Sequence, residues 1–529
     1  MKNETLYYNG VFHSMRSEDD TFSAMSVGEG RITGTYTVRP SGGYASEVDL
    51  GGKHVYPCLI DGHTHLLLTV AMKAVGFTIC EITPHGVEPH TLTGVEARLR
   101  RYAEAQKQNA VIACSNYILS AMDDEQRLPT REELDDWGGG RPVVVYTIDG
   151  HSTALSSAML RLVGIDPEGH SGVLTGEEND RMQGRLTDAL SAVITPAALA
   201  RGIAAFENAC AAYGISVVGA LEGNGDSEKD PTTALIVRLA RHMDVGVRLY
   251  LQYTDLARVK PYLKWMRRPR VGGCGDWEMD GAAGSHSAAF SLPYRDSGET
   301  AECYYEQDFV DTLTAEADAL GWQISSHAIG DRAIERLLTA YEKLPGGRLH
   351  RIEHCEFLTD ELFERLRQGD YALMMQPGYS WIDKRYLHSY ESFLPEEILS
   401  SLRFRSLLDA GLCVCGSSDS PVQELDPWLQ MLGMVQFYRE EESVTPFDAL
   451  RCYTVNPARA LGEEAERGTL EAGKAADFFT AERDFFTLSP AEIAAFRPEE
   501  TYYGGMKYRP RRGSLPELAA MLLRKPRMI

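Results

Sequence analysis

A short apolar run near the start of the chain ends in two histidines: Tyr56-Pro57-Cys58-Leu59-Ile60-Asp61-Gly62-His63-Thr64-His65. Successive side chains of a β-strand point to opposite faces, so His63 and His65 share a face and both imidazoles can reach one metal ion. Such a pair is weak evidence by itself, because polar residues are common at strand ends and a metal site needs further ligands. Those ligands must come from elsewhere in the chain.

Three later residues repeat the pattern. His327, His354 and Asp419 each stand where a short strand pattern ends. In a (β/α)8 barrel the C-terminal ends of the strands meet at one face, and active sites are built there from residues of several strands. The order His-x-His, His, His, Asp therefore predicts an α/β protein with a (β/α)8 TIM barrel, in which these side chains converge.

Several further motifs, in the same order along the chain, resemble the amidohydrolase superfamily and its branch that includes N-substituted formamide deformylases. Besides the histidine pair they are Ile148-Asp149-Gly150-His151, His327-Ala328-Ile329-Gly330-Asp331-Arg332-Ala333, Tyr453-Thr454-Val455-Asn456-Pro457-Ala458 and Gly468-Thr469-Leu470-Glu471-Ala472-Gly473-Lys474-Ala475-Ala476-Asp477. The resemblance implies a metal-dependent hydrolase. It also implies that His63, His65, His327, His354 and Asp419 surround one or two divalent metal ions.

The chain departs from this branch at one position. The phrase that Asp276-Trp277-Glu278-Met279-Asp280-Gly281 resembles usually begins with a lysine, which can be carbamylated to bridge two metals, and here Asp276 takes its place. Strand alternation puts Asp276, Glu278 and Asp280 on one face, so Asp276 or the longer Glu278 is a candidate bridging carboxylate. We rank a site with a single ion above either bridge.

Imidazole and carboxylate ligands suit Zn²⁺ and also Fe²⁺, Mn²⁺ or Co²⁺, and zinc is the default expectation. A metal can lower the pKa of a bound water to about 7. The resemblance implies that Asp419 takes a proton from this water and delivers it to the leaving nitrogen. His354 is expected either to bind a second metal or, with one metal, to polarise the substrate.

Other residues are candidates for contact with the substrate. The resemblance implies that His151 faces the pocket, with a capping or core role as an equal alternative. Asp280 and Gln376 are expected to bind substrate. Tyr379 and Trp381 follow the same strand as Gln376, although aromatic residues in a loop more often serve packing.

The leading functional prediction is hydrolysis of an amide-like, non-peptide C–N bond in a small substrate. Deamination of a heteroaromatic amine is an alternative, because it uses a related barrel with one metal and the usual lysine is missing. A metal-binding scaffold without catalysis is a second alternative. A scaffold has no use for an open metal position, which argues against it.

Size and charge narrow the class of protein. The chain has 529 residues, 76 of them acidic and 53 basic, and a formal net charge of −23. This length predicts a large barrel with an appended domain, and the acidic surface repels nucleic acid and anionic membranes. No signal-peptide pattern, membrane-length apolar run or cysteine framework is present, so a cytoplasmic enzyme is expected, with a homodimer as the default assembly.

The chain divides into three parts. Residues 1–55 show the alternation of a small β-sheet, and the resemblance implies that they join residues 468–529 in one β-sandwich. The barrel is expected over residues 56–467, and the excess length after its first strand is interpreted as an inserted subdomain at about 105–200. The later barrel strands are expected at 215–221, 247–251, around Asp276, before His327, before His354, at 373–376 and before Asp419.

Overall fold

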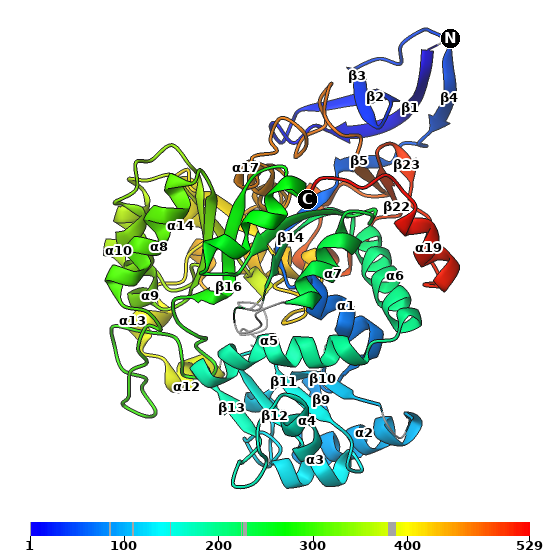
Figure 1. Ribbon diagram of the computed structural model, residues 1–529. Coiled ribbons are helices and arrows are strands. Elements are labelled where there is room, and N and C mark those ends of the chain that lie inside the picture. Colours follow the sequence, from blue (N-terminus) through cyan, green and yellow to red (C-terminus); the bar gives the residue numbers. More distant parts are fainter. Residues whose placement is uncertain are drawn as a thin grey trace.

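Eight parallel strands form the centre of the molecule in the computed structural model, which describes residues 2–83, 86–107, 110–148, 150–223, 225, 230–378 and 388–529 (Figure 1). The strands are β6 (Leu59–Thr64), β14 (Ile215–Glu222), β15 (Gly246–Leu251), β16 (Arg270–Glu278), β17 (Gln323–Ala328), β18 (His350–His354), β19 (Tyr371–Met375) and β20 (Cys413–Gly416). Each pairs with its neighbour in chain order. All eight lie where the sequence predicts them.

The first and last strands of this sheet meet. Thr64 forms a parallel bridge with Ser420, and the Asp61 carboxylate accepts the backbone N–H of Ser418 at 3.1 Å. The N–H of Asp419 donates to the carbonyl of His63 at 3.0 Å. The sheet is therefore a nearly closed (β/α)8 barrel, as predicted, and its closure brings the His-x-His pair beside Asp419.

Helices cover the outside of the barrel, as the buried strands require. They are α7 (Pro231–Ala240), α8 (Gln307–Ala319), α9 (Asp331–Tyr341), α10 (Asp360–Leu366), α12 (His388–Phe393), α13 (Glu396–Leu399), α14 (Arg405–Asp409), α15 (Pro427–Val435), α16 (Pro446–Cys452) and α17 (Val455–Ala460). In α9 the buried residues Ile334, Leu337, Leu338 and Tyr341 recur at helical spacing and form its core-facing stripe.

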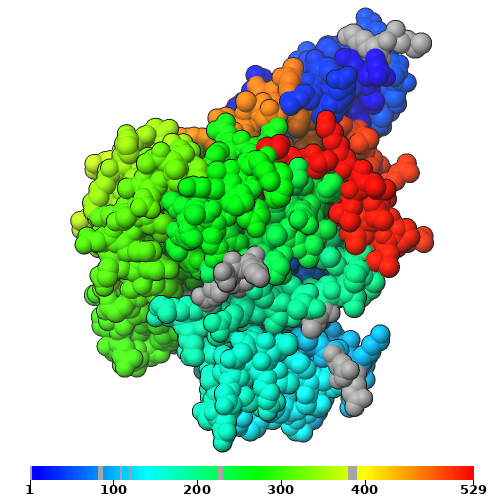
Figure 2. Space-filling model, viewed as in Figure 1, coloured from blue at the N-terminus to red at the C-terminus, as the bar shows by residue number. Residues whose placement is uncertain are grey.

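An inserted subdomain lies between α1 (Leu66–Val75) and α6 (Pro196–Tyr213), at the lower, cyan end of Figures 1 and 2. Its main sheet contains β7 (Gly76–Thr78), β10 (Ile112–Tyr117), β11 (Val143–Thr147), β12 (Ser152–Leu155) and β13 (Val173–Thr175). A two-stranded sheet, β8 (Glu81–Thr83) and β9 (Gly86–Glu88), and helices α2 (Leu92–Ala105), α3 (Arg131–Trp137), α4 (Ser157–Leu162) and α5 (Gly176–Val193) complete it. The sheet begins at Gly76, upstream of the boundary expected near residue 105.

The chain returns to the barrel through α6. Thr195 caps its start by accepting the N–H of Ala198, and Pro196 occupies the first turn, where its missing N–H costs nothing. Gly214 ends the helix with φ 80°, a left-handed conformation that glycine adopts without strain, and β14 follows at once. Among the described residues no single helix has the length and apolar composition to cross a membrane. The helices α5 and α6 meet these two criteria only when they are taken together, as a pair bent by 117°.

The two ends of the chain share a fourth sheet. It contains β1 (Lys2–His13), β2 (Thr21–Gly28), β3 (Arg31–Tyr36), β4 (Tyr44–Asp49), β5 (His54–Pro57), β21 (Phe478–Ala481), β22 (Glu500–Tyr503) and β23 (Met506–Lys507). β5 pairs antiparallel with β21, which joins the N-terminal strands to the C-terminal ones. All eight strands belong to one hydrogen-bonded sheet, and the expected two-layered sandwich is not confirmed.

Candidate active site

A cavity of about 210 Å³ lies at the C-terminal ends of the barrel strands. Its lining combines barrel residues with residues of the insertion, among them His65, His327, His354, Asp419, Tyr146, His151 and Arg181. His63 is fully buried and lies against this group. The structure therefore brings together the five residues that the sequence predicts as metal ligands.

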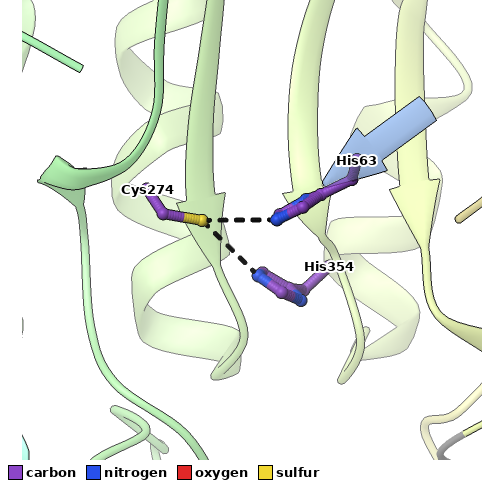
Figure 3. Close-up of side chains that lie close together, drawn as sticks. All are labelled: His63, Cys274 and His354. Atoms are coloured by element: carbon purple, nitrogen blue, oxygen red, sulfur yellow. Dashed lines mark hydrogen bonds between the residues drawn. The ribbon is translucent and has the colours of Figure 1, made fainter. Parts of the chain in front are cut away.

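Two of the histidines point into the same space from strands on different parts of the barrel. His63 comes from β6 and His354 from β18, and their ring centroids are 5.1 Å apart (Figure 3). The His354 ring is also 4.4 Å from that of His327, on β17. His354 has φ 65° and Asp419 has φ 57°, a region that residues other than glycine rarely adopt. Such backbone conformations cluster at functional sites.

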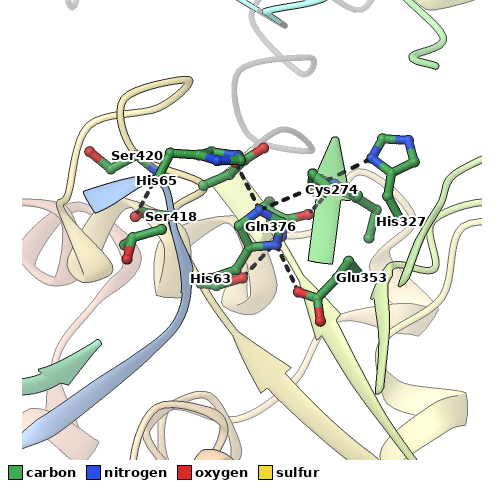
Figure 4. Close-up of polar contacts among 12 residues, drawn as sticks. His63, His65, Cys274, His327, Glu353, Gln376, Ser418 and Ser420 are labelled. Atoms are coloured by element: carbon green, nitrogen blue, oxygen red, sulfur yellow. Dashed lines mark hydrogen bonds and ion pairs between the residues drawn. The ribbon is translucent and has the colours of Figure 1, made fainter. Parts of the chain in front are cut away.

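The histidine pair, labelled in Figure 4, forms the first donor group together with the Asp419 carboxylate. Asp419 Oδ1 lies 3.0 Å from His63 Nε2 and 3.2 Å from His65 Nε2. Burial opposes the charge on Asp419, but the two imidazoles outweigh it and hold the pKa of Asp419 well below its usual range. The carboxylate is therefore ionised at neutral pH.

The outer nitrogen of each buried imidazole has a protein acceptor. His63 Nδ1 donates to Glu353 Oε2 at 2.8 Å, and His354 Nδ1 donates to Gln376 Oε1 at 2.7 Å. His327 Nε2 faces the carbonyl of Gly281 at 3.3 Å. Metal-binding histidines typically hold their second nitrogen in this way, which fixes the ring and leaves a lone pair on the inner nitrogen. All three inner nitrogens face the site.

Glu353 is itself fixed by buried charges. Arg351 donates to both of its carboxylate oxygens, at 2.7 and 2.8 Å, and to the carbonyl of Gly62 at 2.8 Å. The Arg351 guanidinium also lies over the Tyr250 ring, 4.2 Å from its centroid. Burial would raise the pKa of Glu353, but Arg351 and His63 lower it to about 2. The group that orients His63 is therefore a permanent anion.

Two of the buried histidines have the protonation state that metal binding requires. Burial lowers the pKa of His354 to about 4. Burial, together with the neighbouring His354 and His151, also lowers the pKa of His327 well below its usual value. Both imidazoles are thus neutral at pH 7, as ligands must be. His63 differs: burial opposes its protonation, but Asp419 outweighs burial and raises its pKa.

Cys274, on β16, lies at the centre of the site and was not singled out from the sequence. Its Sγ is 3.6 Å from His63 Nε2, 3.9 Å from His327 Nδ1 and 4.0 Å from His354 Nε2. Burial raises the pKa of its thiol to about 12. Strand alternation places Cys274 on the same face as Asp276 and Glu278, so the argument that selected those two residues also reaches it.

The two carboxylates proposed as bridges occupy different positions. Asp276 lines the cavity, but it belongs to none of the groups of potential donor atoms that lie within 4.8 Å of one another in the described residues. Glu278 does belong to such a group, with Cys274 and His327. Its Oε1 also accepts the N–H of Gly275 at 2.9 Å. Of the two, Glu278 is the residue placed near a metal position.

The three residues expected to contact substrate lie in different places relative to the cavity. His151 lines the cavity, with its ring 5.5 Å from that of His327. Asp280 is fully buried and accepts the N–H groups of Ala289, Ile329 and Gly330 at 2.9, 3.0 and 2.8 Å, so it braces the turn after β17 rather than facing the cavity. Gln376 supports His354 from behind.

The backbone explains why these two residues lie outside the cavity. The Asp280 carboxylate accepts three backbone N–H groups that would otherwise be buried without a partner. Gln376 is held in place because its Nε2 donates to Ser417 Oγ at 3.0 Å. Tyr379 and Trp381 lie outside the described residues.

The donor atoms fit a divalent metal ion. In a four-coordinate site with metal–nitrogen bonds of about 2.0 Å and metal–sulfur bonds of about 2.3 Å, neighbouring donors lie about 3.3–3.6 Å apart. The separations of 3.0 and 3.2 Å in the His63–His65–Asp419 group and of 3.6 Å from His63 to Cys274 are close to this range. The residues present therefore suit the ion that the superfamily implies.

Comparisons with known proteins show which family the chain belongs to. The Bacillus subtilis protein YtcJ, provisionally named an amidohydrolase, is 24% identical over 95% of this chain and 98% of its own. The N-substituted formamide deformylase of Arthrobacter pascens is 26% identical, with 97% and 99% covered. The crystal structure of an uncharacterised metal-dependent hydrolase from Pyrococcus furiosus shares the fold, with a TM-score of 0.70 at 22% identity over 92% of this chain and 100% of that one. A model of the amidohydrolase family matches residues 46–506, and the chain therefore belongs to that family.

Proposed function

We propose that this protein is a metal-dependent hydrolase that cleaves an amide-like, non-peptide C–N bond in a small substrate. The observation that carries the proposal is the convergence of imidazole and carboxylate donors from β6, β17, β18 and the end of β20 beside one cavity. Membership of the amidohydrolase family supports hydrolysis. The relative named N-substituted formamide deformylase supports a C–N bond as the bond that is cleaved.

A divalent ion would supply an activated water at neutral pH and would polarise the bond under attack. His63, His65, His327, His354 and Asp419 are the residues that would hold one or two such ions. Asp419 is ionised and contacts both histidines of the pair, so it is placed to accept the proton of the attacking water and to return it to the leaving nitrogen. His354 binds a second ion or, with one ion, polarises the substrate.

Zinc is the ion we propose, because the donors are imidazole and carboxylate groups in a compact arrangement. A cytoplasmic location fits the ten cysteines, all of which are free thiols. The acidic surface, with a formal net charge of −23, fits a protein that binds neither nucleic acid nor anionic membranes. We also propose a homodimer as the assembly, since dimers are the commonest homo-oligomers of soluble proteins.

The test is to incubate the metal-reconstituted protein with a panel of N-substituted formamides and simple amides. Release of the free amine measures turnover. We expect turnover that chelation abolishes and Zn²⁺ restores. The Asp419→Asn variant with its metal bound is the matched control and should be inactive. Metal-loaded wild-type protein that cleaves none of these bonds would contradict the proposal.

Deamination of a heteroaromatic amine is the second candidate, because Asp276 stands where the branch usually has its bridging lysine, and the loss of that lysine favours a site with one ion. A parallel panel of such amines, read by ammonia release, separates the two reactions. Ammonia without amide cleavage assigns the protein to the deaminases. Bound metal without turnover in either panel leaves only the scaffold.

A further inference from the structure

Cys274 belongs to two of the three donor groups of the site. The first group contains His63, His65 and Asp419, and Cys274 joins His63 and His354 in a second and Glu278 and His327 in a third. Figure 3 shows its sulfur directed at His63 and His354. The side chain is 4% exposed, and it faces the inner nitrogens of three imidazoles at 3.6 to 4.0 Å.

The local backbone is arranged to turn this residue inward. Gly272, Gly273 and Gly275 have φ of 97°, 121° and 60°, which only glycine adopts readily. Between Gly273 and Glu278 the pairing of β16 with β17 shifts, so that several residues of β16 face a single step of its neighbour. The resulting bulge projects Cys274 into the barrel mouth, and bulges of this kind commonly re-aim a side chain beside an active site.

A buried cysteine usually acts as a small apolar residue. Cys114 is an example, since it is fully buried within a cluster of apolar side chains in the insertion. Cys274 has a different environment, because its sulfur faces the inner nitrogens of three imidazoles, of which His63 Nε2 also contacts Asp419 Oδ1 at 3.0 Å. A thiol contributes little to packing there. A thiolate, by contrast, completes a set of metal donors.

We infer that Cys274 binds the active-site metal as a thiolate and replaces, from the same strand, the lysine that the branch usually provides. As the metal–sulfur bond forms, the S–H bond breaks and its proton leaves to the buffer, which is the normal fate of a coordinating thiol. The position of Sγ between the donor groups makes this sulfur a bridge when two ions are bound. The inference rests on the proposed function only in requiring that the site binds a divalent ion.

A sulfur donor also narrows the choice of metal. Thiolate ligands favour Zn²⁺ and other thiophilic ions, whereas Mg²⁺, Ca²⁺ and Mn²⁺ prefer sites built from oxygen. The protein should therefore bind Zn²⁺ and Co²⁺ in clear preference to Mn²⁺. It should also bind metal equally well with and without bicarbonate, because no lysine is present among the described residues that line the cavity.

The experiment is the absorption spectrum of the Co²⁺-substituted protein. Wild type should show an intense thiolate-to-Co²⁺ charge-transfer band in the near ultraviolet, and Cys274→Ser should lose it and bind the ion at least ~10-fold more weakly. Cys114→Ser, which removes a cysteine buried away from the site, should keep the band. Cys274→Asp retains an anionic donor, so it should bind Co²⁺ without the band even if the serine variant folds poorly.

A second measurement needs no variant. Alkylation of apo and Zn²⁺-loaded wild type, mapped by mass spectrometry, should show that the ion slows modification of Cys274 by at least 10-fold. Cys303, which is partly exposed and outside the site, should react equally in both forms. Absence of the band from Co²⁺-loaded wild type, or its persistence in Cys274→Ser, would overturn the inference.

These outcomes separate the ligand from the reaction. Amide cleavage by a protein whose Co²⁺ form lacks the band leaves the proposed function intact and removes Cys274 from the ligand set. A charge-transfer band in a protein that cleaves no C–N bond keeps Cys274 in the ligand set and removes the proposed function.

Discussion

Asp419 combines two properties in one residue. Its carboxylate contacts both members of the His-x-His pair, and its backbone, with φ 57°, lies in the left-handed region. Aspartate and asparagine tolerate that region better than most residues. Asparagine is therefore a substitution that preserves the backbone and one oxygen donor while removing the ability to carry a proton.

Asp419→Asn should retain much of the bound metal and lose at least ~10²–10⁴-fold in activity. The loss should lie chiefly in kcat, because the carboxylate acts in the transition state rather than in substrate binding. Steady-state kinetics on protein of known metal content provide the measurement. A kcat within a few-fold of wild type at full metal occupancy would exclude the role of proton carrier.

Glu353 acts indirectly, because it accepts the hydrogen bond of His63 Nδ1 and so orients that ring. Glu353→Gln keeps the shape but loses the charge that pairs with Arg351, so we expect metal affinity to fall by about 10–100-fold. Competition with a chelator measures the affinity. Glu364→Gln, which removes one partner of an exposed ion pair on α10, is the matched control and should have no effect. Unchanged affinity in Glu353→Gln would show that Arg351 and Glu353 serve stability alone.

At the scale of single elements, β16 differs most from an ordinary barrel strand. The other strands follow the rule that buried apolar residues lead to a polar residue at the C-terminal end. This rule was enough to place His327, His354 and Asp419 from the sequence. In β16 the glycines break the regular pairing, and the active-site sulfur comes from the middle of the strand.

Gly272→Ala tests whether this distortion positions the site. An added Cβ would lie 1.9 Å from the carbonyl oxygen of Ser325, at a position with φ 97°. We expect a loss of more than about 1 kcal/mol in stability together with reduced metal content. The control is Gly52→Ala, where φ is 85° but no atom lies within 4 Å of an added Cβ. Both variants carry the backbone strain, so the difference between their melting temperatures measures the crowding at Gly272. Equal effects of the two substitutions on metal content would contradict a positioning role.

The sequence predicted the barrel strands and the convergence of the five candidate ligands at one end of the barrel, because buried parallel strands and strand-end polar residues leave a local pattern. It did not predict the roles of Asp280 and Gln376, which depend on backbone donors and a side chain contributed by other segments. Cys274 was missed for a different reason. The resemblance marks position 276, where the lysine is absent, whereas the sulfur that we propose as a ligand lies two residues earlier on the same face.

At the scale of the whole molecule, the two ends of the barrel have different tasks. The cavity is at the C-terminal ends of the strands, whereas a buried charge network is anchored by Arg248, near the start of β15. Glu463 accepts from Arg248 at 2.9 Å and from Arg467 at 2.7 Å, and Arg467 pairs with Asp477 beside the end sheet. This separation follows the general rule for barrels, in which one face serves catalysis and the other stability.

Glu463→Gln should cost about 3–5 kcal/mol at pH 7, since it leaves buried guanidinium groups without their anion. Burial opposes ionisation of Glu463, but Arg248 and Arg467 outweigh it and lower its pKa to about 2. Because the pKa of Glu463 is lower in the folded than in the unfolded chain, its charge stabilises the fold fully at pH values above about 4.3, the ordinary pKa of glutamate. This contribution fades as the pH falls toward 2. The difference in melting temperature between variant and wild type should therefore narrow below about pH 4.

Glu464→Gln, at the exposed neighbouring position, is the control and should change stability by less than about 0.5 kcal/mol at every pH. If the difference in melting temperature between Glu463→Gln and wild type stays constant from pH 7 to pH 3, the charge of the Glu463 carboxylate contributes nothing to stability.

The bridge between β6 and β20 sets an order of events during synthesis. Asp61 and Ser418, which are joined by a hydrogen bond beside that bridge, are 357 residues apart in the chain. At about 5–20 residues per second, a ribosome needs roughly 20–70 s to add the second after the first. Throughout that interval the histidine pair has left the ribosome without the carboxylate that completes its donor group. The growing chain can therefore expose these imidazoles to any passing ion, and selective loading with the right one must wait until translation has nearly ended.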